Sequence, residues 1–326
     1  MSVKGKVKTL VKGGSAKALI KNKALRGEEI VTGFPSRINV EPTNQCNLRC
    51  NMCPRKDLTR PVGEIDMGLF GKIADEISRH APAEVRLHKD GEPLMAPHIF
   101  DLIDHIKTVA PSTLLNMDTN ALLLDEEKAG RILDSKLDVL LFSVNAATAE
   151  TYRQVRGSTK FDQVVGNIER FLAMRAERGY VWPKVKVQLI VMAETRDEIG
   201  LFKEKWGSHD VDVLLIPAIN WGGHRPEVQS LMQLPGKRYP CTYLFNSFSI
   251  NWDGKVSFCN VDFNHLGIIG DLNEQSIEEI WQGPGMERYR RLHKEGRWDE
   301  IDLCRDCNYW AYTRNVWYQA PGRGWL

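Results

Sequence analysis

Seven cysteines, gathered in two sets, are the residues of this chain whose spacing points most directly to chemistry. The first set has the spacing CxxxCxxC, and the second set ends in a CxxC pair. The members are Cys46, Cys50 and Cys53 in the first set and Cys241, Cys259, Cys304 and Cys307 in the second. Thiolates ligate zinc and iron–sulfur centres, and closely grouped cysteines in a chain without an export signal indicate metal binding rather than disulfides.

The number of cysteines in each set helps to distinguish a zinc site from an iron–sulfur cluster. A structural zinc ion normally takes four protein ligands, whereas a [4Fe–4S] cluster held by three cysteines keeps one iron open for an outside ligand. Three thiolates in the first set therefore favour an iron–sulfur cluster, with a zinc site or a redox thiol as the alternatives. Four thiolates in the second set suit zinc as well as a cluster, so spacing alone leaves both open there.

The elements that must position the first set follow an alternating pattern. Six short apolar runs alternate with helix-length amphipathic segments, which is typical of βα units. The predicted strands are 38–41, 85–88, 114–118, 139–143, 185–192 and 213–217, and the predicted helices are 70–79, 99–109, 126–135, 161–178 and 198–206. Such units build a parallel sheet that can curl into a barrel, with reactive groups at the carboxyl ends of the strands.

The pattern changes after the last predicted strand, where glycine, proline and tryptophan become frequent. Residues 248–258 predict a β-hairpin, because Asp253-Gly254 near the middle supplies the positive φ angles of a tight turn. A short helix is predicted over 277–281, with Ser276 as its N-cap. The predicted domains are a basic N-terminal extension (1–35), a barrel (36–230) and a small C-terminal domain with an aromatic tail (231–326).

The loop that carries the first cysteine set resembles that of the radical S-adenosylmethionine (SAM) superfamily, whose CxxxCxxC loop follows the first barrel strand. Three later motifs also resemble the superfamily and occur in its order. They are G-E-P-L at 91–94, T-N-A-L-L at 119–123, and S-V-N-A-A-T at 143–148 followed by R-G at 156–157. Asp90, Ala121 and Asn145 stand where the family usually has Gly, Gly and Asp. The joint order of the motifs carries the resemblance.

The resemblance implies an α/β fold with a partial (β/α)6 radical SAM barrel, in which the first cysteine set holds a [4Fe–4S] cluster and SAM binds the open iron. It implies cofactor contacts for Gly91, Glu92, Asn120, Ser143 and Arg156. The segment of Glu92 would hold the amino group of SAM. Ser143 and Arg156 would contact its carboxylate, a role that suits the planar guanidinium. The implied activity is cleavage of SAM to a 5′-deoxyadenosyl radical, which abstracts hydrogen from a substrate carbon.

The region of the second cysteine set resembles the auxiliary-cluster region of SPASM and twitch members of the same superfamily. A full SPASM domain has more cysteines and two auxiliary clusters, so four cysteines fit the single-cluster twitch type. The resemblance therefore implies two [4Fe–4S] clusters in all. With four protein ligands, the auxiliary cluster would accept an electron from the substrate radical, which makes a net oxidation the expected outcome.

The expected activity is that of a dehydrogenase-type oxidoreductase, which removes two electrons from a secondary alcohol of an aminocyclitol or sugar, as in antibiotic biosynthesis. The expected partners are a small polyhydroxylated substrate and a one-electron reductant such as flavodoxin or ferredoxin. Peptide modification is one alternative, although about 35 residues before the barrel are few for a leader-binding domain. Epimerisation is another, but it usually needs a free cysteine to return hydrogen. A zinc-binding, non-catalytic adaptor is the third.

The sequence does not identify the catalytic group. The candidates are Lys89, Gln188, His224 and Arg225. Further candidates for binding substrate or removing the hydroxyl proton are His88, Asp118, Asn220 and Trp221. A structural role is the alternative for each of these residues. The aromatic tail is interpreted as a packing surface, and its members are Tyr309, Trp310, Tyr312, Trp317 and Tyr318.

Charge is distributed unevenly along the chain. The net charge is +2, but the first 26 residues carry seven Lys and one Arg without an acid, which leaves the rest at +2 − 8 = −6. The basic stretch is either a solvated face or an amphipathic helix that touches an anionic lipid, nucleic acid or an acidic partner. The chain has no apolar run of about 18 residues and no apolar secretory core, which predicts a cytoplasmic protein without a membrane span.

Overall fold

The structure is a computed structural model that describes residues 32–228, 230, 231 and 233–314. Most of the predicted basic extension lies outside the described residues, and so do Trp317 and Tyr318 of the aromatic tail. What the sequence predicts for those segments stays a prediction. In the described part of the chain, no helix is both long and apolar enough to cross a membrane.

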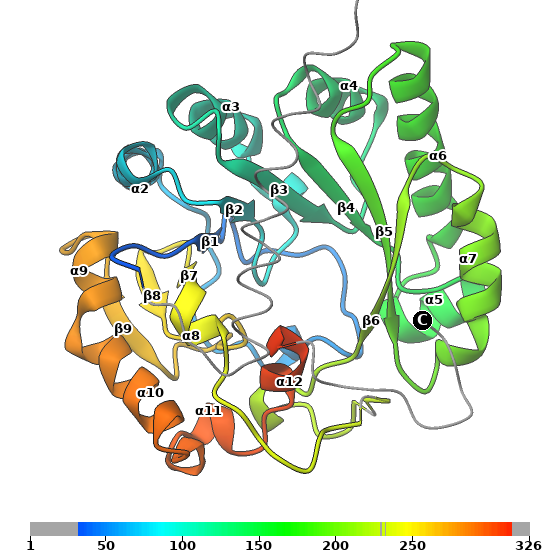
Figure 1. Ribbon diagram of the computed structural model, residues 1–326. Helices are drawn as coiled ribbons and strands as arrows, with labels where there is room; N and C mark the ends of the chain where they lie inside the picture. The colour runs from blue at the N-terminus through cyan, green and yellow to red at the C-terminus, as the bar shows by residue number, and fades with distance from the viewer. Residues whose placement is uncertain (1–31, 229, 232, 315–326) are drawn as a thin grey trace, which may run out of the picture.

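Nine strands form the sheet that organises the described chain. They are β1 (Arg37–Val40), β2 (Glu84–Leu87), β3 (Leu114–Thr119), β4 (Val139–Ser143), β5 (Lys184–Val191), β6 (Asp212–Pro217), β7 (Ser247–Ile250), β8 (Lys255–Ser257) and β9 (Ile268–Asp271). Their order in the sheet is β6-β5-β4-β3-β2-β1-β7-β8-β9. The six predicted strands are β1 to β6, which pair in parallel as predicted and curl into an open, partial barrel (Figure 1).

The described residues form eleven helices, and those that follow the barrel strands pack on the outside of the curled sheet (Figure 1). They are α2 (Met67–His80), α3 (Ile99–Val109), α4 (Glu126–Asp134), α5 (Ala149–Arg156), α6 (Phe161–Glu177), α7 (Ile199–Gly207), α8 (Tyr243–Asn246), α9 (Ile277–Gln282), α10 (Pro284–Lys294), α11 (Asp302–Arg305) and α12 (Tyr309–Arg314). Five barrel helices agree with the predicted ranges to within a few residues, whereas α5 was not predicted. The predicted N-cap Ser276 begins α9 and forms a capping box with Glu279.

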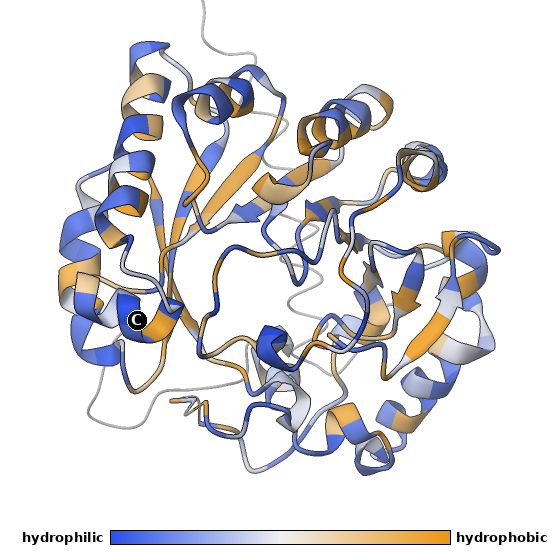
Figure 2. Cartoon of the chain, turned by 180° about the vertical axis from the view of Figure 1, so that it is seen from behind, coloured by the Kyte–Doolittle hydropathy of each residue, from blue (hydrophilic) through white to orange (hydrophobic). Residues whose placement is uncertain are grey.

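Hydrophobic periodicity explains how the helices attach to the sheet. In α6, Val164, Ile168 and Phe171 recur at helical spacing and are fully buried, so one stripe of the helix packs on the strands. Figure 2 shows the same division, with largely hydrophobic barrel strands and helices that alternate between hydrophobic and hydrophilic residues. Burial of these stripes fixes the helices outside the sheet, and the carboxyl ends of the parallel strands then share one edge.

The predicted hairpin forms, but its first strand also joins the barrel sheet. Strand β7 pairs in parallel with β1, with Phe248 opposite Ile38, while β8 pairs with β7 in the antiparallel sense. Gly254 has a φ of 86° in the hairpin turn, a value that glycine adopts without strain. Backbone hydrogen bonds therefore tie the region of the second cysteine set to the first barrel strand. The domain boundary near residue 230 stays a prediction.

Candidate active site

The first cysteine set lies in the loop after β1, and three neighbouring segments hold the backbone of this loop. The amide of Glu92 donates to Gln45 O over 2.7 Å, and the amide of Asn51 donates to Val155 O at the end of α5 over 3.0 Å. The indole Nε1 of Trp221 donates to Met52 O over 2.8 Å. Because these contacts use main-chain groups, they fix the path of the loop whatever side chains it carries.

Two glycines sit directly against this cysteine loop. A Cβ added at Gly91 would lie 2.1 Å from Thr43 O and 2.7 Å from Gln45 O. Gly157 has a φ of +66°, and a Cβ there would lie 2.8 Å from Arg49 O. All three distances are shorter than any ordinary carbon–oxygen contact, so the G-E-P-L and R-G motifs carry glycine where the backbone must approach the cysteine loop.

Glu92 organises the loops that follow β2 and β3. Its buried carboxylate accepts hydrogen bonds from the hydroxyl of Thr119 at 2.6 Å, the amide of Asn120 at 2.7 Å and the amide of Leu94 at 3.1 Å. Burial raises the pKa of Glu92, and these donors oppose the shift. The side chain of Asn120 is engaged as well, because its amide nitrogen donates to Asn47 Oδ1 over 2.8 Å. Both residues line the same cavity as the first cysteine set.

Arg156 on α5 and Ser143 on β4 also line the cavity of the first cysteine set, which is called the cofactor cavity below. Arg156 is only 6% exposed, and its Nε has no hydrogen-bond partner among the described residues. A buried guanidinium N–H without an acceptor is costly, and a bound carboxylate would satisfy it. The Ser143 hydroxyl oxygen accepts from Asn145 Nδ2 at 3.0 Å and Gln188 Nε2 at 3.4 Å. These residues fit the carboxylate of SAM.

The second cysteine set surrounds a small buried cavity in the C-terminal part of the chain. Burial, reinforced by repulsion between neighbouring thiolates, raises the pKa of Cys259 and Cys304 well above the usual range and that of Cys307 to about 11. The His293 Nδ1 accepts from the Cys241 amide at 3.1 Å, which leaves the His293 Nε2 to donate to Cys304 Sγ at 3.4 Å. Four thiolates at this place need a positive centre, which a metal cluster supplies.

The arrangement of the thiols bears on the choice between zinc and an iron–sulfur cluster. Four thiolates around one zinc ion, at Zn–S distances of about 2.3 Å, would lie about 3.8 Å from one another. Within the described ranges, no group of three or more His, Cys, Asp or Glu side chains lies close enough together to hold a single ion. A [4Fe–4S] cluster is likewise held by four cysteine thiolates, and all four cysteines of the second set line this one cavity.

Comparison with known protein families identifies the two parts of the chain. Residues 40–204, slightly more than half of the 326, match the radical SAM superfamily. The chain belongs to this superfamily. Residues 241–308, which contain the whole second cysteine set, match the SPASM iron-sulfur cluster-binding domain. Both parts of the predicted resemblance are confirmed, and the protein is a radical SAM enzyme with an auxiliary-cluster domain.

Individual relatives agree with this assignment. The S-adenosyl-L-methionine-dependent 2-deoxy-scyllo-inosamine dehydrogenase of Niallia circulans is 23% identical over 275 residues, which are 84% of this chain and 92% of the relative. The spacing of the second cysteine set also resembles that of this dehydrogenase. A tungsten-containing aldehyde ferredoxin oxidoreductase cofactor-modifying protein of Pyrococcus furiosus is 24% identical over 178 residues, which are 54% of this chain and 49% of the relative.

Solved structures show the same fold. The crystal structure of BtrN in complex with AdoMet and 2-DOIA superposes with a TM-score of 0.56 at 21% identity, covering 89% of this chain and 97% of that one. Native anSMEcpe with bound AdoMet superposes with a TM-score of 0.61 at 14% identity, covering 85% and 90%. At these identities the likeness concerns the fold, which confirms the predicted barrel with a C-terminal auxiliary-cluster domain.

The close approach of Gly91 to the cysteine loop gives a first prediction. Gly91→Ala should displace the loop, lower the iron content to about half that of the wild type, and destabilise the protein by about 1–3 kcal/mol through overpacking. Iron analysis after anaerobic reconstitution and thermal unfolding measure the two effects. Gly71→Ala in α2 is the matched control, because its added Cβ meets no atom within 4 Å. Full iron content and unchanged stability of Gly91→Ala would show that the loop tolerates displacement.

The proposed SAM carboxylate site gives a second prediction. Arg156→Ala should weaken SAM binding about 10-fold or more, because a charge-assisted hydrogen bond is worth about 1.5–3 kcal/mol, and Ser143→Ala should weaken it less. Iron content should not change, since neither residue is a proposed cluster ligand. Equilibrium binding of SAM to the anaerobically reconstituted protein measures the effect. Arg153→Ala, at an exposed position of the same helix, should bind SAM normally; equal affinity of all three variants would refute these roles.

A second cavity, of about 260 Å³, adjoins the cofactor cavity. The two share six lining residues, which are Met52, Asp118, Leu141, Gln188, Ile190 and Trp221. A molecule bound in this second cavity would therefore lie next to the cofactor cavity. Burial raises the pKa of Asp118, but Arg86 at 3.3 Å and His88 at 3.5 Å outweigh the effect and hold the pKa at about 2. Asp118 is therefore a carboxylate at neutral pH.

The four candidates for the catalytic group are placed very differently. Gln188 lines both cavities. Lys89 lines the cofactor cavity but is paired with Asp90, and its Nζ also donates to Asp262 O at 2.9 Å. His224 is exposed and packs edge-on against Phe263, with ring centroids 5.5 Å apart, and it lines neither cavity.

The fourth candidate, Arg225, faces the backbone of the cysteine loop. Its buried guanidinium donates to Cys53 O at 3.1 Å and to Asn51 O. Asn220, from the same segment, donates to Asp306 O at 2.6 Å and so reaches the second cysteine set instead of the cavity. The segment 220–225 therefore contacts both cysteine regions. Its residue Trp221 also lines the second cavity.

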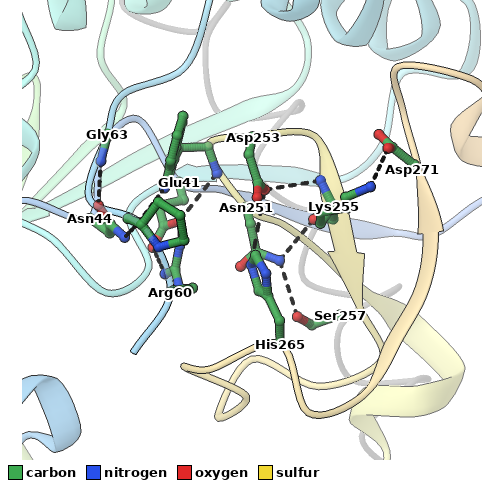
Figure 3. Close-up of polar contacts among 12 residues, drawn as sticks. Glu41, Asn44, Arg60, Gly63, Asn251, Asp253, Lys255, Ser257, His265 and Asp271 are labelled. Carbon is green, nitrogen blue, oxygen red and sulfur yellow. Dashed lines mark hydrogen bonds and ion pairs between the residues drawn. The ribbon is translucent and has the colours of Figure 1, made fainter. Parts of the chain in front are cut away.

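A buried network of ion pairs holds the loop of the first cysteine set in place. Arg60 pairs with Glu41 at 2.6 Å and with Asp90 at 3.0 Å, and all three side chains are 3% exposed or less. The amide of Trp252, in the hairpin turn, donates to Glu41 at 3.2 Å. Figure 3 shows Arg60 and Glu41 beside the hairpin residues. The network joins the loop after β1, the segment after β2 and the auxiliary hairpin into one support.

Several residues of the cavity wall did not emerge from the sequence patterns. Arg86 on β2 and Lys186 on β5 line the second cavity, of about 260 Å³, which is called the substrate-side cavity below. Arg86 lies two residues before the predicted candidate His88, and Lys186 lies two residues before the predicted candidate Gln188. Because alternate strand residues share a face, strand alternation was the signal that could have found them. Tyr309, interpreted as part of a packing surface, lines both this cavity and that of the second cysteine set.

Proposed function

We propose that the protein is a radical SAM dehydrogenase that removes two electrons from a secondary alcohol of a small polyhydroxylated molecule, an aminocyclitol or a sugar. One observation carries the proposal: a single cavity borders both cysteine regions. Met52 and Trp221 line it beside the first set, and Tyr309 lines it beside the second. The Tyr309 amide also donates to Cys307 Sγ at 3.3 Å. A substrate in this cavity would lie between the site of hydrogen abstraction and a proposed electron acceptor.

The proposed ligand sets follow the two groups of cysteines. Cys46, Cys50 and Cys53 would hold one [4Fe–4S] cluster, and Cys241, Cys259, Cys304 and Cys307 would hold a second. Gly91, Glu92, Asn120, Ser143 and Arg156 would form the SAM site. When bound, these groups supply a 5′-deoxyadenosyl radical and accept one electron from the substrate. Residues 36–230 would form the barrel and 231–326 the auxiliary domain.

The residues that line the substrate-side cavity would exclude water and bind the hydroxyl group of the substrate. Leu141, Ile190 and Ile216 form part of an apolar wall, which excludes water from a reactive intermediate. Asp118 is the one acidic side chain among the described residues that line this cavity, and it is ionised at neutral pH. We assign it the task of accepting a hydrogen bond from the hydroxyl group of the substrate, with Gln188 as a positioning donor. Arg86 and His88 hold the carboxylate in place.

Peptide modification is the second candidate. The curated relatives include mycofactocin maturase of Mycobacterium tuberculosis, 29% identical over 53% of this chain. A cavity of about 260 Å³ is slightly smaller than the range of about 300–1,000 Å³ for small-molecule sites, which favours a small substrate over a peptide. We further propose a cytoplasmic location and reduction by flavodoxin or ferredoxin.

The test is turnover under anaerobic, reducing conditions. The reconstituted protein is incubated with SAM and a panel of cyclitols, amino sugars and short peptides, and products are identified by mass spectrometry. The proposal predicts one 5′-deoxyadenosine per product molecule and a product two hydrogens lighter than an alcohol substrate. Modification of peptides alone would replace this proposal with the second candidate.

A further inference from the structure

We propose that the substrate carries an anionic group, a carboxylate or a phosphate, that binds Lys186 inside the substrate-side cavity. The inference rests on the proposed function, because it concerns the alcohol that the dehydrogenase would oxidise. Lys186 stands on β5 opposite Leu141 of β4, and it lines the cavity together with Gln188 two residues later. Its side chain is half-buried because it forms part of the wall of this cavity.

The charges around Lys186 do not balance. Two carboxylates, Glu84 and Asp118, face three cations, Arg37, Arg86 and Lys186. Arg37 pairs with Glu84 at 2.9 Å, and Arg86 bridges Glu84 at 3.4 Å and Asp118 at 3.3 Å. The charge of Lys186 lowers the pKa of Asp118 from a distance. This local group therefore carries an excess of one positive charge.

Among the cations of this group in the described part of the chain, Lys186 is the one without a carboxylate partner. Among residues 32–228, 230, 231 and 233–314, Lys186 makes no hydrogen bond and no ion pair, whereas Asp118 already contacts Arg86 and His88. A charged group taken partly out of water is costly unless it is paired. A bound anion would pair with Lys186, while a substrate ammonium would meet two cations in the cavity wall and one carboxylate that is already shared.

The rest of the wall indicates what else the substrate presents. Asn116, Gln188 and Tyr312 offer neutral hydrogen-bonding groups in the cavity lining. Apolar residues alternate with them across the sheet, since Val139 pairs with Asn116 and Leu214 with Gln188. A lining that mixes hydrogen-bonding groups with apolar side chains suits a hydroxylated carbon ring. The inference thus narrows the proposed aminocyclitol or sugar to an acidic alcohol, one that also carries a carboxylate or a phosphate.

The test measures binding without turnover. The anaerobically reconstituted, SAM-loaded protein, with no reductant, is titrated with four matched ligands: a hydroxycyclohexane carboxylate, the corresponding phosphate ester, the neutral carboxamide and the amine. At least one anionic ligand should bind about 10-fold or more tightly than the carboxamide, and the better anion identifies its kind. Lys186→Met should remove this preference, and Lys186→Arg should retain it. Lys184→Met, at an exposed position of the same strand, should leave it unchanged.

Two results would overturn the inference: tighter binding of the amine than of both anions, or an anion preference that survives in Lys186→Met. Binding is measured without reductant, so the outcome does not depend on the reaction that follows. An anion preference together with no oxidised product would refute the dehydrogenase proposal alone. Oxidation of a neutral or cationic alcohol with no anion preference would refute this inference alone.

Discussion

Replacement of Cys46, Cys50 and Cys53 together by alanine should lower the iron of the anaerobically reconstituted protein from about eight to about four atoms per chain and abolish 5′-deoxyadenosine formation. The reason is the separation of the two cysteine sets. The first set shares a cavity with the proposed SAM residues, and the second surrounds a different cavity. Loss of the first set therefore removes the SAM-binding cluster and leaves the auxiliary ligands complete. Iron and sulfide analysis and chromatography of SAM products measure the two effects.

The reciprocal variant is the control for this experiment. Cys304→Ala with Cys307→Ala should also lose about four irons but should keep SAM cleavage, because its first cysteine set is intact. Stoichiometric zinc and no iron uptake in the wild type would refute the cluster assignment for both sets. Loss of all iron in the first variant would show that the two sites assemble together.

The sequence predicted the elements whose signal is local. Strand β4 and helix α3 were predicted to the residue, since apolar runs and helical spacing report burial directly. Helix α5 was missed, because its eight residues include few apolar positions, although Thr148 caps it through a hydrogen bond to the Thr151 amide. The parallel pairing of β7 with β1 joins residues about 210 apart in the chain, and no local pattern reports a pairing of that kind.

The same distinction separates the parts of the site. The cysteines could be predicted because ligand spacing within a loop is local. His224 and Arg225 are neighbours with the same predicted role, yet one is exposed and the other is buried against the cysteine loop. Only the tertiary fold decides which of them faces the loop. The charge excess at Lys186 likewise depends on residues from four strands and could not be predicted from any one of them.

Loss of the auxiliary site should have its largest effect on which product the reaction forms. Cys304→Ala with Cys307→Ala should preserve SAM cleavage and hydrogen abstraction but block formation of the oxidised product. In the structure, Tyr309 connects the substrate-side cavity to the second cysteine set, since its ring lines both cavities and its amide donates to Cys307 Sγ. The variant removes the proposed electron acceptor on this side of the cavity, whereas Arg156 and Ser143 at the SAM site are untouched.

Isotopic labelling separates hydrogen abstraction from oxidation. With deuterium at the carbinol carbon of the substrate, label should appear in 5′-deoxyadenosine for both the wild type and the variant. Only the wild type should yield a product two hydrogens lighter than the substrate, in a one-to-one ratio with 5′-deoxyadenosine. Mass spectrometry of both products measures these quantities, and the iron content of the variant confirms that the first cluster is present.

An isomeric product of unchanged mass would give the opposite conclusion about the reaction. All seven cysteines of the chain belong to the two sets, so a hydrogen returned to the substrate radical would have to come from another side chain. Tyr309 and Tyr312 line the cavity, and burial raises the pKa of both, which keeps their O–H groups protonated. Solvent-derived hydrogen at the abstracted carbon would therefore establish epimerisation with a donor other than cysteine, and Tyr309→Phe and Tyr312→Phe would test whether either tyrosine is that donor.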